Sequence, residues 1–230
     1  PLGTTTVTVS AKDAAGNTAT GTFTVTVVDT TAPVINVPGQ LVVFAGSTAG
    51  AAVNFAAAAQ DLVDGAVSVA YSHQPGSLFA PGQTVVTVTA TDAHGNRSQA
   101  TFVVWVQFQW SGVLQPINVA PNPTSIFKLG RTVPVKFALS GVSAGITNAT
   151  ARLSFRKLQG SVEGEVSEAD STSAATVGNL FRFDAEGGQY IFNWDTKPLA
   201  SSAALGQGTY VLFVDFGDGV EHGVLVSFRN

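Results

Sequence analysis

The segment Gly141-Val142-Ser143-Ala144-Gly145 matches the G-x-S-x-G motif in which serine hydrolases carry their nucleophile. In that motif, a sharp turn between a strand and a helix exposes the serine hydroxyl. A strand is predicted before the segment, but residues 146–150 are poor in helix-forming side chains. We therefore expect Ser143 to lie in a loop of small residues, and we predict no catalytic residue and no enzyme activity.

Aspartates form a second set of reactive side chains, since most of them fall at predicted turns, where the carboxylate can bond its own backbone. Carboxylates at strand ends can also bind calcium between sandwich modules, but calcium needs about six to eight oxygen ligands and no D-x-D-x-D loop is present. The histidines His73, His94 and His222 show no metal-ligand spacing. We predict no metal site and no cofactor, with calcium as the alternative. The turn aspartates are Asp13, Asp61, Asp64, Asp92, Asp215 and Asp218.

Composition excludes several classes of protein. Only 11% of the 230 residues are charged and the net charge is −4, so the basic patch that nucleic-acid binding requires is not expected. A hydrophobic fraction of 45% argues against intrinsic disorder. No apolar run approaches the length of about 18 residues that membrane insertion needs. Cysteine is absent, which excludes disulfides and cysteine-bound metals.

Strict alternation of apolar and polar residues dominates the N-terminal segment. Val7 and Val9 share one face of a predicted strand, and Phe23, Val25 and Val27 share one face of the next, while threonines fill the opposite faces. The residues between these strands, 13–17, are typical of a turn. No segment shows sustained helical periodicity, although residues 163–176 could form one short helix or a loose loop. We predict an all-β protein.

The N-terminal pattern is repeated further along the chain at an offset of 79 residues, the difference between Gly82 and Gly3. The same offset relates Asp13 to Asp92 and Phe23 to Phe102. A repeat of this length that carries several short strands indicates tandem immunoglobulin-like β-sandwiches. We predict that residues 1–28 form the second half of one repeat, a β-hairpin, and that residues 29–107 form a complete one.

Three segments, 29–33 (DTTAP), 59–65 (AQDLVDG) and 89–96 (TATDAHGN), closely resemble the hyalin-repeat (HYR) module. The resemblance implies an immunoglobulin-like sandwich related to fibronectin type III, as found in extracellular and adhesion proteins. It therefore implies a secreted or cell-surface location. It supplies no catalytic residue.

The C-terminal segment, 108–230, resembles the PxKF domain of bacterial secreted proteins, which often follows hyalin repeats. The resemblance rests on residues 134–137 (PVKF), 188–196 (GQYIFNWDT) and 208–212 (GTYVL). Family members often carry cysteines, and this sequence has none. Strands are expected over 133–139, 151–155, 180–183, 189–194, 209–213 and 224–228, with a hairpin turn over 215–219. We predict a second β-sandwich here.

One predicted strand of the complete repeat is apolar on both faces, because Val103 and Trp105 replace Thr24 and Thr26 of the first copy. Such strands are usually covered on both sides. Trp105 is therefore expected to pack against the C-terminal domain or a partner chain. The apolar face of the hairpin also needs a cover, from the first half of its own repeat, from the C-terminal domain or from another chain. The predicted interface residues are Val7, Val9, Phe23, Val25, Val27, Val103, Trp105 and Trp110.

These observations predict a non-catalytic structural or adhesive module of a larger bacterial surface or secreted protein. Strand complementation by the half repeat is the expected route to self-assembly. The expected partners are other copies of the chain or neighbouring modules. The alternative is an accessory glycan-binding segment of a secreted enzyme, with Trp105, Trp110 or Trp194 as a stacking platform for cell-surface glycans.

Overall fold

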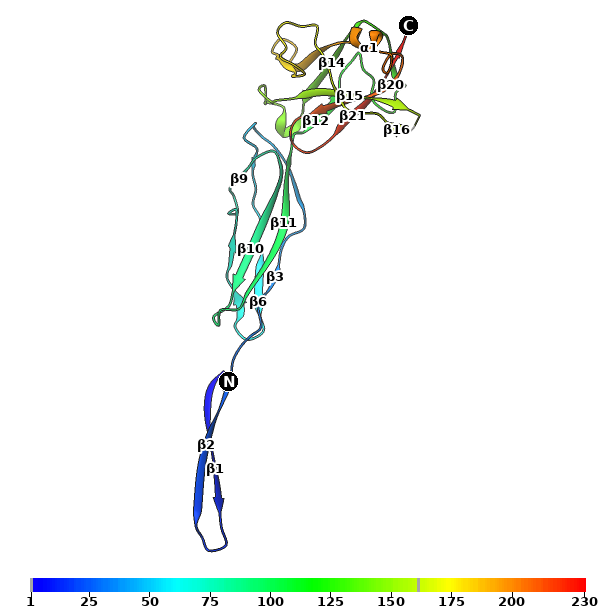
Figure 1. Cartoon of the computed structure of the whole chain (residues 1–230). Coiled ribbons are helices and arrows are strands. Elements are labelled where there is room, and N and C mark those ends of the chain that lie inside the picture. The colour runs from blue at the N-terminus through cyan, green and yellow to red at the C-terminus, as the bar shows by residue number, and fades with distance from the viewer. Residues whose placement is uncertain (1, 161) are drawn as a thin grey trace. The chain divides into compact units, whose positions relative to one another are not determined.

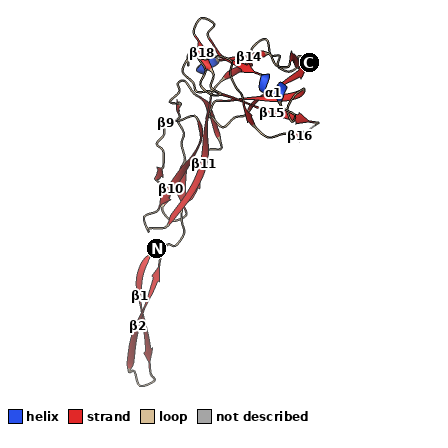
Figure 2. Cartoon of the chain, turned by 45° about the horizontal axis from the view of Figure 1, so that its top comes forward, coloured by secondary structure: helices blue, strands red, loops and turns tan. Residues whose placement is uncertain are grey.

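The computed structural model describes residues 2–160 and 162–230, and it is nearly all β, as predicted (Figures 1 and 2). The chain divides into two compact units. The first unit comprises the chain up to Pro38 with residues 56–74 and 86–102, and the second comprises residues 39–55, 75–85 and 103–230. In the part of the chain that the structure describes, no helix has the length and hydropathy of a membrane span.

The N-terminal hairpin consists of β1 (Gly3–Lys12) and β2 (Thr18–Val27), which pair antiparallel along their whole length. The predicted turn over 13–17 is present. Both carboxylate oxygens of Asp13 accept hydrogen bonds from Asn17, one from its backbone N–H and one from its side-chain amide, each at 2.8 Å. Gly16 adopts a φ of 93°, a conformation that few other residues tolerate. The turn thus fixes the register of the two strands.

The complete repeat is built from short strands around two long ones, β10 and β11 (Figure 1). Four strands form one sheet in the order β4 (Leu41–Phe44), β11 (Arg97–Gln107), β10 (Gly82–Thr91), β8 (Val69–Tyr71). A second sheet has the order β3 (Val34–Asn36), β6 (Ala58–Asp61), β7 (Gly65–Val67), and β5 (Ala51–Ala52) pairs with β9 (Leu78–Phe79). Alternate residues from the middle of each long strand onward are 0–5% exposed, so these parts carry the core: Val86, Val88 and Ala90 in β10, and Phe102, Val104 and Val106 in β11.

The C-terminal domain consists of two further sheets. One has the order β12 (Trp110–Val113), β14 (Thr132–Leu139), β19 (Gln189–Asp195), β18 (Arg182–Asp184). The other has the order β13 (Ser125–Lys128), β21 (His222–Arg229), β20 (Gly208–Asp215), β15 (Arg152–Gln159), β16 (Val162–Glu163), and β17 (Ser167–Glu168) also pairs with β15. The six strands predicted for this domain are all present within one to four residues at their ends, and a hairpin turn joins β20 to β21.

Helices are confined to two short pieces in the described residues. A single turn of 3₁₀ helix, η1, spans Gly141–Ser143, and α1 spans Lys197–Ser201. The sequence pattern did not predict α1. This helix has a proline, Pro198, in its first turn, where proline is well tolerated. Of the two possibilities for 163–176, the described residues show short strands and turns rather than a helix.

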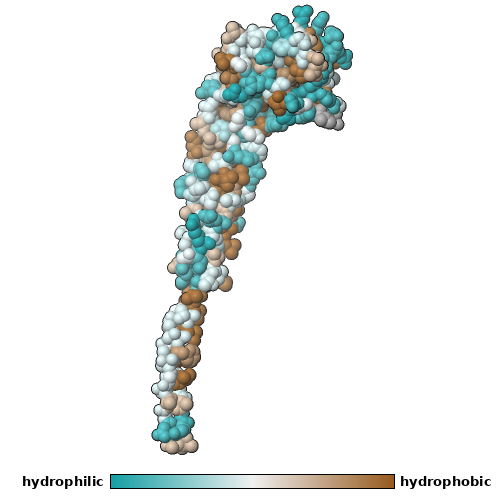
Figure 3. Space-filling model, viewed as in Figure 1, coloured by the Kyte–Doolittle hydropathy of each residue, from teal (hydrophilic) through white to brown (hydrophobic). Residues whose placement is uncertain are grey.

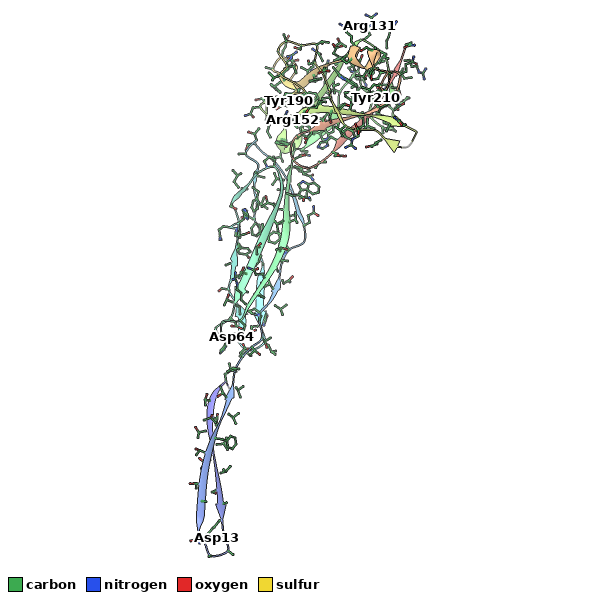
Figure 4. The ribbon with its side chains drawn as sticks, in the orientation of Figure 1. Asp13, Asp64, Arg131, Arg152, Tyr190 and Tyr210 are labelled. Atoms are coloured by element: carbon green, nitrogen blue, oxygen red, sulfur yellow. The ribbon has the colours of Figure 1, made fainter. Side chains whose placement is uncertain are left out.

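Aromatic rings fill the core between the two C-terminal sheets. Tyr190 stacks on Phe137 at 4.8 Å between ring centroids, and its hydroxyl donates to the Ile146 carbonyl and accepts from the Ala149 N–H. Tyr210 is fully buried, and this burial raises its pKa to about 12. Figure 4 labels both tyrosines within the domain. The core is therefore built mainly from aromatic contacts, with the polar tips of the tyrosines bound to backbone groups.

Candidate functional site

The hairpin leaves one apolar face exposed. Val9, Phe23, Val25 and Val27 are each 45–53% exposed, and Val7 is half-buried. Figure 3 shows hydrophobic residues along one side of this hairpin. The residues at the repeat offset are identical in type, and in the complete repeat all of them are 0–5% exposed: Val86, Val88, Phe102, Val104 and Val106. The hairpin therefore presents the inner face of half a sandwich.

Trp105 lies on the opposite face of β11, within the second unit, and contacts the turn that joins β20 to β21. Its indole Nε1–H donates to the Asp218 carbonyl at 2.7 Å. The ring also lies beside Gly219, whose φ of 77° the turn requires. Both Trp105 and Val103 are half-buried. The apolar outer face of β11 thus lies next to the C-terminal domain at Trp105.

Trp105→Thr tests this contact, because threonine is the residue that the first copy carries at the equivalent position, Thr26. We expect the free energy of unfolding of the second unit to fall by about 1–3 kcal/mol, from the lost hydrogen bond and lost ring packing. Urea denaturation followed by circular dichroism measures the change. Trp105→Phe keeps much of the ring and should cost less, so equal losses for the two variants would contradict the expected ring contribution.

Asp218 is the most buried carboxylate of this contact, with 0% exposure. Its Oδ2 accepts from the Phe108 N–H at 2.9 Å and its Oδ1 from the Val220 N–H at 3.1 Å. His222 Nε2 lies 4.0 Å from Oδ2, too far for a hydrogen bond but close enough for charge attraction. Burial alone raises the pKa of Asp218, but His222 and the two N–H donors lower the pKa by more, so the net shift is downward. The carboxylate thus fastens the segment after β11.

Ser143 is also fully buried and bonds only to backbone groups of the second unit. Its hydroxyl donates to the Ala45 carbonyl at 2.7 Å and accepts from the Gln109 N–H at 3.0 Å. The expected loop is the 3₁₀ turn η1. The G-x-S-x-G match therefore marks a serine that ties the end of the repeat to the C-terminal domain, with its hydroxyl buried rather than exposed as in a nucleophile turn.

The three tryptophans named for the alternative sugar-stacking platform lie in different surroundings. Trp194 has 0% exposure, because it packs among Phe155, Tyr210 and Phe228, and it is unavailable for stacking. Trp110 is half-buried, and its ring lies 4.5 Å from the ring of His222. The structure thus places Trp110 beside the Asp218 contact and Trp194 in the core.

A group of four aspartates in the first unit was not foreseen as a cluster. Asp29, Asp61, Asp64 and Asp92 each place one carboxylate oxygen within 4.8 Å of the others. They come from three segments: Asp29 precedes β3, Asp61 ends β6 and Asp64 lies in the turn that follows it, and Asp92 lies in the turn between β10 and β11. Figure 4 labels Asp64 at this end of the repeat. Asp61, Asp64 and Asp92 were predicted as separate turn residues, and the sequence spacing gave no sign that they converge.

His94 is the basic side chain that contacts this cluster. Its Nδ1 lies 3.1 Å from Asp64 Oδ2 and 3.6 Å from Asp29 Oδ2. Asp92 accepts three hydrogen bonds, from the backbone N–H and the side-chain amide of Asn96 and from the His94 N–H. Burial raises the pKa of Asp92, but these hydrogen bonds and the electrostatic attraction of His94 lower the pKa by more, so the net shift is downward. Asp92 is therefore stabilised as an anion.

Comparison with known proteins identifies the repeats. The HYR domain family matches residues 1–27 and 28–106 of this chain. Hyalin of Lytechinus variegatus is 44% identical over 110 residues, which are 45% of this chain and 21% of that protein. Hyalin of Strongylocentrotus purpuratus is 34% identical over 160 residues, which are 66% of this chain and 12% of that protein. The chain thus spans a small part of the length of these relatives.

Solved structures that match this chain include the protocadherin gammaB7 EC3-6 cis-dimer, with 17% identity and a TM-score of 0.26 over 98% of this chain and 58% of that chain. Another is mouse cadherin-23 EC22-24, with 13% identity and a TM-score of 0.26 over 98% of this chain and 72% of that chain. At these scores the alignments do not place individual residues.

Proposed function

We propose that this protein is an extracellular, non-catalytic structural or adhesive module of a larger surface or secreted protein. The HYR repeats and the similarity to two hyalins support this role. The observation that carries it is the exposed hairpin face, since identical side chains are buried in the complete repeat. A surface shaped as the inside of a sandwich is suited to contact with another β-structure rather than to chemistry.

The proposed contact is strand complementation between HYR halves. The hairpin supplies the equivalents of β10 and β11, so the complementary piece is the equivalent of β3 to β9, supplied by a second copy or a neighbouring module. Main-chain pairing at the strand edges would give affinity, and the pockets for Phe23, Val25 and Val27 would give specificity. A head-to-tail contact of this kind builds filaments when it does not close.

In the same proposal, residues 108–230 are a PxKF-type domain and the parent protein is bacterial. The support is the sequence resemblance around Pro134 and Phe137. Both residues lie in β14, where the side chain of Phe137 is fully buried among other rings.

The test is the assembly state of the chain. We expect light scattering to show concentration-dependent oligomers, and the double variant Phe23→Thr/Val25→Thr to weaken association by about 100-fold or more, since two apolar side chains lose their burial. The matched control Thr24→Ser/Thr26→Ser alters the other face of the same strand and should leave assembly unchanged. A wild-type chain that stays monomeric at all concentrations, with the hairpin amides protected from exchange, would contradict complementation in trans.

A further inference from the structure

Four carboxylates within 4.8 Å of one another raise a problem of charge in the first unit. Asp29, Asp61 and Asp92 are buried, at 8%, 3% and 7% exposure. Buried charges in proteins are normally paired, hydrogen-bonded or bound to a metal. One imidazole, His94, offers at most a single positive charge against up to four negative ones, so the cluster lacks a sufficient counter-charge among the described residues.

Hydrogen bonds account for only part of this cluster. Asp61 Oδ1 accepts from the N–H groups of Val63 and Asp64 at 2.7 and 3.0 Å, and Asp29 Oδ1 accepts from the Thr31 N–H at 3.0 Å. The second oxygen of each, Oδ2, is buried and accepts no hydrogen bond from any described residue. The side chain of Asp29 is only 1% exposed. Two buried carboxylate oxygens without a hydrogen bond thus belong to one cluster, and of the two only Asp29 Oδ2 has His94 Nδ1 nearby, at 3.6 Å.

The first copy of the repeat offers an internal comparison. Asp13 and Asn17 form the same turn as Asp92 and Asn96, with matching hydrogen bonds, but among the described residues Asp13 belongs to no group of three or more potential metal ligands. Turn formation therefore explains Asp13 and Asp92. It does not explain why Asp29 and Asp61 each bury an oxygen without a hydrogen bond beside Asp64 and Asp92.

We propose that this cluster is a calcium site formed by Asp29, Asp61, Asp64 and Asp92. An all-carboxylate set of hard oxygen ligands from irregular turns suits Ca²⁺, which accepts about six to eight oxygens in flexible geometry, and water can complete the shell. Mg²⁺ requires a near-ideal octahedron and keeps its water shell, so it suits a convergent carboxylate set less well. The ion would join the start of the repeat, at Asp29, to the β6–β7 and β10–β11 connections of the same repeat. This inference does not depend on the adhesive role.

Titration of the whole chain with Ca²⁺ by calorimetry tests the site. We expect one site per chain with a Kd on the order of 0.1–1 mM, the range of extracellular calcium modules. Asp61→Asn and Asp29→Asn keep the Oδ1 acceptor but remove the unpartnered anionic oxygen, and each should weaken binding by about 10-fold or more. Asp13→Asn is the matched control and should bind as the wild type does. Calcium should also raise the melting temperature of the wild type.

Backbone NMR shifts of the wild type give a readout that needs no variant. Calcium should shift the amide signals of Thr31, Val63 and His94, while that of Asn17 stays in place. The proposal is overturned by an absence of heat and of shifts at about ten times the expected Kd. Tighter binding of Mg²⁺ than of Ca²⁺, or unchanged binding in both Asn variants, would also overturn it. Phe23→Thr/Val25→Thr, the variant designed to be monomeric, should bind calcium normally, which separates this result from the assembly test.

Discussion

Asp218→Ala is expected to lower the free energy of unfolding of the second unit by about 2–4 kcal/mol. The carboxylate is fully buried, and its removal leaves the N–H groups of Phe108 and Val220 without their acceptor. His222 also loses its nearby negative charge. Urea denaturation followed by circular dichroism would measure the loss.

The matched control lies in the same turn. Asp215 is exposed and its Oδ1 accepts from the Gly217 N–H at 2.7 Å. Asp215→Ala should therefore cost no more than about 1 kcal/mol, since water can replace the lost acceptor. Equal losses for Asp218→Ala and Asp215→Ala would show that burial of the Asp218 carboxylate contributes nothing particular to the fold.

The downward pKa shift of Asp218 adds a pH dependence with a definite sign. Its native pKa lies below the ordinary value of 3.8, so the folded state favours the ionised carboxylate. This stabilisation is present above the unfolded pKa of about 3.9 and is lost as the pH falls through the native value. Asp218→Asn should flatten this part of the acid-unfolding profile, and an unchanged profile would contradict the assignment.

Trp194→Ala is the substitution with the largest expected effect, a loss of about 3–5 kcal/mol. The ring is fully buried and lies about 5 Å from those of Phe155 and Phe228, at 5.0 and 5.3 Å between centroids. Alanine would leave a large cavity between the two C-terminal sheets, because the neighbouring side chains are close-packed and cannot move far enough to fill the cavity. Thermal unfolding would report the loss as a lower melting temperature.

Trp194→Phe separates the cavity from the polar group. The indole Nε1–H is buried and has no hydrogen-bond partner among the described residues. Phenylalanine removes this unsatisfied donor while it keeps an aromatic ring, so the cost should be well below that of alanine. Equal losses for Trp194→Phe and Trp194→Ala would contradict this expectation. They would indicate that the indole N–H makes a stabilising hydrogen bond in solution.

The strands were predictable from the sequence because their apolar residues alternate strictly with polar ones. In β1 and β2, Val7, Phe23 and Val25 share a face, and the repeat offset carries the same pattern into β10 and β11. Substitutions against this repeat were equally informative, since the change from Thr26 to Trp105 pointed to a contact on the outer face of β11. The helix α1 was missed because its five residues are too few to show a periodicity.

The candidate sites were less predictable, because they depend on convergence in space. Asp29, Asp61 and Asp92 belong to three separate segments, and no local motif relates them. Ser143 carried a misleading motif, since its buried bonds to Ala45 and Gln109 become visible only when the strands are assembled. The alternation of apolar residues and the sequence repeat thus predict the strands, whereas metal-ligand sets and buried hydrogen bonds can be identified only from the folded structure.

Asp29 lies just after the hairpin, and Phe108 occupies the equivalent position after the complete repeat, 79 residues further on. The two side chains differ in kind. Phe108 packs on Phe216 and donates its N–H to Asp218, so the second linker is shaped for one particular neighbour. Trp105, in place of Thr26, has the same specialisation. The repeat before the C-terminal domain is therefore specialised for that neighbour. Repeats inserted before Asp29 would leave this junction unchanged. An ordinary repeat inserted after Gln107 would separate Trp105 from Asp218 and so break their hydrogen bond.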